Sequence, residues 1–93
     1  SFDVARRTFK ALNHPPGEAH VLDNRARVHL IEDRLDEAEG AWLEALGVYQ
    51  GITAPQLADV RSSGLVDIRT KLERLYRETN QAGKLRGLAT EEE

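Results

Sequence analysis

The stretch "DRLDEAEGAWLEAL", residues 33–46, decides the fold of this 93-residue chain. Its apolar side chains recur at alternating spacings of three and four residues, which places them on one face of a helix. They are Leu35, Ala38, Trp42, Ala45 and, just beyond the quoted stretch, Tyr49. Gly51 follows as a predicted C-terminal cap. The pattern therefore predicts a helix over 36–49.

Three further segments show helical periodicity: 3–13, 18–32 and 54–79. The sequence "NHPPG" separates the first two, because proline lacks an N–H and turns the preceding residue away from helical geometry. Thr53 and Gln56 have the spacing of a capping box at the start of the last. "KLRGLA", residues 84–89, predicts one short final helix, and 91–93 is expected to be a disordered acidic tail.

Composition sets the class of protein. The chain is 40% hydrophobic and 31% charged, as in folded globular domains. A net charge of −3 gives no electrostatic footprint for nucleic acid, and no apolar run is long enough to span a membrane. The absence of cysteine favours a reducing cytoplasm. Because the chain also lacks methionine, we expect it to be a processed product or a piece of a longer protein.

The helical pattern repeats. An equivalent set lies 33 residues upstream, with Ala5, Phe9 and Leu12 matching Ala38, Trp42 and Ala45. Periods of about 34 residues are typical of helix–turn–helix solenoids. On these residues the chain resembles the tetratricopeptide repeat (TPR) family, whose small and aromatic residues of helix A fall on Ala26 and His29 and whose turn glycine falls on Asp33. Arg25, in place of leucine, departs from the family, and the register is ambiguous after residue 50.

The resemblance implies an all-α fold of four to five helices, with antiparallel pairs stacked as a short right-handed solenoid. Residues 1–90 would form one domain with three parts: helix B of a partial repeat over 3–13, a full repeat over 18–50, and a long helix over 54–79 that could cap the stack. The alternative is a plain antiparallel helical bundle in which the spacing is a coincidence.

The sequence offers little catalytic chemistry. The histidines lack the i, i+4 spacing of a helical metal site, and the acidic run from Glu32 to Glu39 falls at a predicted turn and helix N-terminus, where carboxylates are favourable without any further role. Motifs for nucleotides or activated nucleophiles are absent. We therefore expect a protein that is not an enzyme and has no cofactor or bound metal.

The resemblance instead implies a module of a larger bacterial protein that binds a protein or peptide partner in a groove lined by helix A. An amide can hydrogen-bond a peptide backbone, and a guanidinium can hold a carboxylate with two hydrogen bonds. An ordinary polar surface is the alternative, because one repeat makes a shallow groove. The family's groove positions fall on His20, Asp23, Asn24, Arg27 and Ile31.

A second predicted surface follows from helix 3–13, which would be a helix B without its own helix A. Its apolar side chains would then stay uncovered and support self-association, most simply as a two-fold dimer. An alternative function of another class is therefore a helical oligomerisation domain, or a sensor domain of a transcription regulator. The predicted self-association residues are Phe2, Val4, Phe9 and Leu12.

Overall fold

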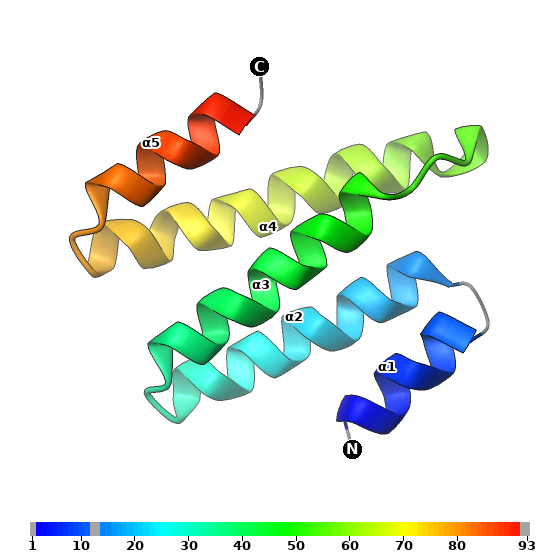
Figure 1. Cartoon of the computed structure of the whole chain (residues 1–93), viewed down its shortest axis with the longest axis horizontal. Helices are drawn as coiled ribbons and strands as arrows, with labels where there is room; N and C mark the ends of the chain where they lie inside the picture. Colours follow the sequence, from blue (N-terminus) through cyan, green and yellow to red (C-terminus); the bar gives the residue numbers. More distant parts are fainter. Residues whose placement is uncertain (1, 12–13, 92–93) are drawn as a thin grey trace.

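The computed structural model describes the backbone of residues 2–11 and 14–91, and the side chains of residues 3–8 and 14–88. Every regular element within these ranges is helical, which confirms the all-α prediction. The elements are α1 (Phe2–Ala11), α2 (Pro15–Ile31), α3 (Leu35–Gln50), the 3₁₀ turn η1 (Pro55–Leu57), α4 (Ala58–Glu78) and α5 (Ala82–Glu91) (Figure 1).

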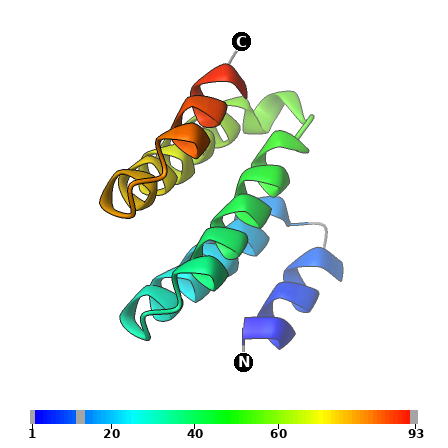
Figure 2. The same cartoon turned by 60° about the vertical axis from the view of Figure 1, so that its left-hand side comes forward.

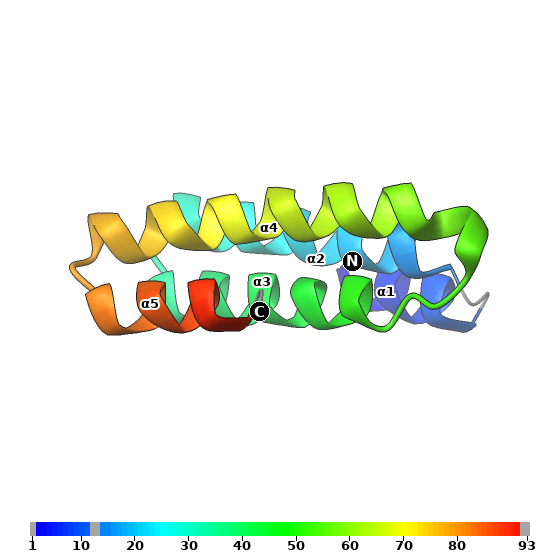
Figure 3. The same cartoon turned by 90° about the horizontal axis from the view of Figure 1, so that it is seen from above.

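The helices pack in chain order, α1 on α2, α2 on α3, α3 on α4 and α4 on α5. They lie side by side from α1 at one edge to α4 and α5 at the other (Figure 2). Seen from above, they form two layers, with α2 and α4 in one and α1, α3 and α5 in the other (Figure 3). The Cα atoms occupy a flat slab of 38 × 33 × 13 Å.

The start of α2 differs from the prediction. The helix begins at Pro15, three residues before the predicted start, with both prolines inside its first turn. Nδ1 of His14 accepts a hydrogen bond from the backbone N–H of Gly17 at 2.9 Å and so caps the helix. The first helical N–H groups have no partner within the helix, so Pro15 and Pro16 cost no hydrogen bond there.

The turn from α2 to α3 matches the prediction. Asp33 has a φ of 61°, the left-handed conformation that glycine usually takes and that aspartate tolerates. The N–H of Arg34 then donates to the carbonyl of His29 at 2.8 Å. Because this turn is tight, α3 runs back antiparallel to α2 (Figure 1), as the sequence predicted for this helix pair.

The start of α4 and the end of the chain each differ from an expectation. Ala54 is extended and precedes Pro55, which opens the 3₁₀ turn η1 before α4 begins. No side chain caps this turn, so the predicted capping box of Thr53 and Gln56 does not form. At the other end, α5 is longer than the predicted 84–89 and includes Glu91 of the predicted tail; residues 92–93 lie outside the described part of the chain.

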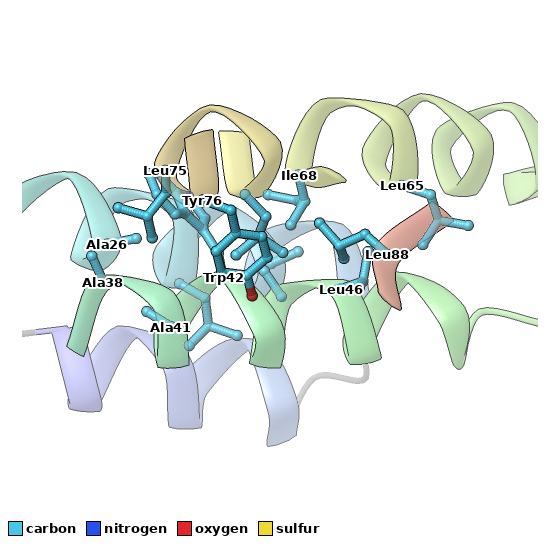
Figure 4. Close-up of a cluster of buried hydrophobic side chains, with 14 residues drawn as sticks. Ala26, Ala38, Ala41, Trp42, Leu46, Leu65, Ile68, Leu75, Tyr76 and Leu88 are labelled. Carbon is cyan, nitrogen blue, oxygen red and sulfur yellow. The ribbon is translucent and has the colours of Figure 1, made fainter. Parts of the chain in front are cut away.

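The core is built around Trp42, which is 3% exposed. It lies in one cluster with Leu22 and Ala26 of α2. Alanines at the α2–α3 contact let the two helices approach closely. The other side of the cluster comes from α4 and α5, through Leu65, Ile68, Leu72, Leu75, Tyr76 and Leu88 (Figure 4).

Candidate functional site

Two hollows lie along α4, on either side of Lys71, and α3 contributes one aromatic side chain to each. Helix α2 lines only the first of them, through Leu30. We call this surface, with the neighbouring edge of α2, the groove. The Trp42 hollow has a volume of about 340 Å³ and is lined by Leu30, Trp42, Lys71, Arg74, Leu75 and Glu78. The Tyr49 hollow has a volume of about 490 Å³ and is lined by Tyr49, Asp59, Val60, Ser63, Gly64 and Asp67.

Between the hollows, the carboxylate of Asp23 links three helices. Its Oδ1 accepts hydrogen bonds from Trp42 Nε1 of α3 at 2.9 Å and from Lys71 Nζ of α4 at 2.8 Å. Its Oδ2 accepts a second one from Lys71 at 2.9 Å and lies 3.5 Å from Arg27 Nη2. Lys71 also donates to Asp67 at 3.0 Å. Asp23 is only 8% exposed, so every one of these partners helps to offset the cost of burying its charge.

The network shifts the acid–base equilibria of both its charged ends. Burial alone raises the pKa of Asp23, but the hydrogen bonds from Lys71 and Trp42 and the charges of Lys71 and Arg27 outweigh it, so the pKa lies below the usual 3.8. Burial lowers the pKa of Lys71, but hydrogen bonds to Asp23 and Asp67 raise it above the usual 10.5. The ion pair is therefore charged at neutral pH.

The other predicted groove residues follow one edge of α2. His20 and Arg27 are exposed and Asn24 is half-buried. Asn24 Nδ2 and His20 Nε2 lie 3.3 Å apart, and Ile31, at the end of the helix, is also exposed. The structure thus brings together His20 with Asn24 and Asp23 with Arg27, but it places Asp23 beneath the surface that the others form.

Sequence reasoning did not find the α3 and α4 side of the groove. Gly64 is buried, and a Cβ built on it would overlap the ring of Tyr49. Glycine therefore allows the close approach that forms the floor of the Tyr49 hollow. Two signals pointed here: Tyr49 continues the apolar face of Trp42, and Gly64 keeps helical phase on α4.

The predicted self-association surface is described only in part. Val4 is 60% exposed on α1, whereas the side chains of Phe2 and Phe9, and the whole of Leu12, lie outside the described residues. Ion pairs hold α1 to its neighbours, including Arg25 with Asp3 at 3.2 Å. Self-association through α1 stays a prediction.

No family model, curated protein or solved structure matches the chain. Within residues 2–11 and 14–91, none of the helices is both long and apolar enough to cross a membrane. The same part of the chain brings no three His, Cys, Asp or Glu side chains together as metal ligands. The case for a function therefore rests on the groove.

Proposed function

We propose that the chain is a non-enzymatic TPR-like module that binds a segment of a partner protein in the groove along α4. The observation that carries the proposal is the pair of hollows with Trp42 and Tyr49 in their linings; on the neighbouring α2, Arg27 reaches this surface through its contact with Asp23. An apolar floor supplies affinity, and a few polar groups at its edge fix orientation.

The arrangement of the helices supports a TPR-like stack over a closed bundle. In a closed bundle the first and last helices pack together around a common core. Here α1 lies at one edge of a slab and α4 and α5 lie at the other (Figure 2), and successive helices alternate between two layers (Figure 3). In a stack of helix pairs, α2 and α4 would be the first helices of two pairs and would share one face, as stacking of repeats requires.

Two side chains on α2 have the chemistry to hold a peptide. The amide of Asn24 can both donate to and accept from a peptide backbone. The side chain of Arg27 is 59% exposed, and its guanidinium keeps donors free for a carbonyl or carboxylate, because its contact with Asp23 is a single one of 3.5 Å. Both side chains lie on the same edge of α2, one turn apart.

Selection from a library of random dodecamer peptides tests the proposal. The intact chain should capture peptides, and Asn24→Ala and Arg27→Ala should each weaken binding of the best peptide about five-fold or more, as interface contacts of this kind do. Melting temperatures should stay within about 4 °C of the parent, since exposed substitutions change stability little. Calorimetric titration measures the affinities, and circular dichroism measures the melting.

Arg34→Ala is the matched control. Arg34 has nearly the same side-chain exposure as Arg27, 58% against 59%, but lies at the turn between α2 and α3. Its replacement should leave peptide affinity unchanged. Failure to capture any peptide, or equal affinity in the two groove variants and the parent, would remove the proposed function.

A further inference from the structure

The two hollows of the groove differ in charge. In the Trp42 hollow the cations are already paired: Lys71 contacts Asp23 and Asp67, and Arg74 donates to Glu78 at 3.1 Å. The apolar part of the hollow's lining comes from the half-buried Leu30, with Trp42 and Leu75 almost fully buried beneath it. This hollow suits an apolar side chain.

The Tyr49 hollow is acidic. Asp59 and Asp67 both line it. Asp67 is paired with Lys71 at 3.0 Å, whereas in the described part of the chain no basic side chain pairs with Asp59. Burial raises the pKa of the Tyr49 hydroxyl, and the carboxylates of Asp67 and Asp23 raise it further, against the opposing effect of Lys71. At the hydroxyl of Tyr49, the negative charge of Asp67 and Asp23 thus outweighs the positive charge of Lys71. A cation beside its ring would be favoured there.

The ion pair between the hollows limits the shape of an occupant. Asp23 and Lys71 bridge the groove at its middle, so an occupant must pass over them. An α-helix with its side chains is about 10–12 Å wide, whereas an extended chain is narrower and can direct separate side chains into the two hollows. An extended segment can therefore reach both hollows while its backbone passes over the ion pair.

We propose that the groove binds an extended partner segment that places an apolar side chain in the Trp42 hollow and an arginine or lysine in the Tyr49 hollow. This inference rests on the proposed function and adds the chemistry of the partner. The basic side chain would lay its methylene stem along Val60 and Gly64 and place its charge beside Asp59, next to the aromatic ring of Tyr49.

The distance between the hollows fixes the spacing of the two anchors. Ser63 lines the Tyr49 hollow and Leu75 the Trp42 hollow, and twelve positions of α4 separate them (75 − 63). At 1.5 Å per residue this is roughly 18 Å, which an extended chain covers in about five or six residues. The basic and apolar anchors should therefore be five or six residues apart.

The dodecamer selection described above gives the first test. Captured peptides should be enriched in arginine and lysine relative to the input library, with an apolar residue five or six positions away. Capture of peptides without this enrichment, or with enrichment in acidic residues, would overturn the inference and leave the proposed function standing. Failure to capture any peptide would instead remove the proposed function, and this inference with it.

A double-mutant cycle gives the second test. Asp59→Asn should weaken the best arginine-containing peptide roughly three-fold to five-fold, the size expected for an exposed ion pair. The same peptide with glutamine in place of its arginine should bind equally to the parent and to Asp59→Asn. Asp36→Asn is the control, because Asp36 is exposed in the first turn of α3 as Asp59 is in the first turn of α4. If Asp59→Asn weakens binding of the arginine and glutamine peptides equally, Asp59 does not contact the arginine.

Discussion

Two ion pairs of the same length tie helices together in very different settings. At the centre, Lys71 Nζ lies 2.8 Å from Asp23 Oδ1, with side-chain exposures of 22% and 11%. At the edge, Arg6 Nη2 of α1 lies 2.8 Å from Glu44 Oε2, with exposures of 32% and 49%. Distance alone would rank them equally. Burial and the remaining hydrogen bonds separate them.

The charged groups of the central pair have further hydrogen-bond partners, whereas the pair at the edge includes a buried nitrogen that has none. Asp23 also accepts a hydrogen bond from Trp42, so its charge is held from two other helices. At the edge, Nε of Arg6 is buried without a hydrogen bond, 3.5 Å from Glu18. Removing one partner of a buried pair leaves an uncompensated charge, whereas an exposed pair contributes little. We therefore expect α2, α3 and α4 to form the stable unit and α1 to be held more weakly.

The largest expected effect is at the centre. Trp42→Ala should lower the free energy of unfolding by about 3–5 kcal/mol, because it leaves a cavity in the core and removes a hydrogen bond from Asp23. A domain of this size has a total stability of about 5–15 kcal/mol, so the variant should be close to unfolding. Urea denaturation followed by circular dichroism measures the change.

Trp42→Phe is the companion variant, because it keeps a buried ring and loses only part of the volume and the N–H. It should cost less than Trp42→Ala. If Trp42→Ala instead melts within a few degrees of the parent, the ring does not organise the core, and the contrast between centre and edge has no basis.

Much of this centre was predictable from sequence, and much of the site was not. The face that carries Trp42 follows from helical periodicity, which is a local property, and the left-handed turn at Asp33 follows from local sterics. The bond from Lys71 to Asp23 joins residues 48 positions apart, and no periodicity indicates such a pairing. The predicted start of α2 was wrong, because prolines disfavour the interior of a helix but are compatible with its first turn.

The next effect is a pH dependence of stability. The pKa of Asp23 is lowered in the folded state. Its contribution to the free energy of unfolding should therefore be fully present above about pH 4, near the unfolded pKa, and should disappear as the pH falls further. The raised pKa of Lys71 has the opposite sign: its contribution is complete below about pH 10 and is lost above it. Between these limits the central pair is at full strength.

Asp23→Asn checks the acid side of this range. It should cost about 1–3 kcal/mol at pH 7, through loss of charged hydrogen bonds, and less at pH 3, where the parent has begun to lose the same contribution. Chemical denaturation at both pH values gives the two differences. An equal cost at pH 7 and pH 3 would show that the charge of Asp23 does not stabilise the fold; Asp36→Asn, at an exposed carboxylate, provides the baseline.

The smallest expected effect is at the edge, and it tests the comparison directly. Arg6→Ala should lower the free energy of unfolding by about 1 kcal/mol, because its pair with Glu44 is half-exposed and weakened by solvent, and its contact with the more buried Glu18 is longer, at 3.5 Å. Lys71→Ala should cost several times more, because it leaves Asp23 buried without its main partner.

Salt separates the two variants further. At 1 M the Debye length is about 3 Å, so the Arg6 contribution to stability should nearly vanish, while the better shielded Lys71 contribution persists. Denaturation of both variants at low and high salt supplies the four values, and equal costs for Arg6→Ala and Lys71→Ala would mean that burial does not distinguish the centre of this protein from its edge.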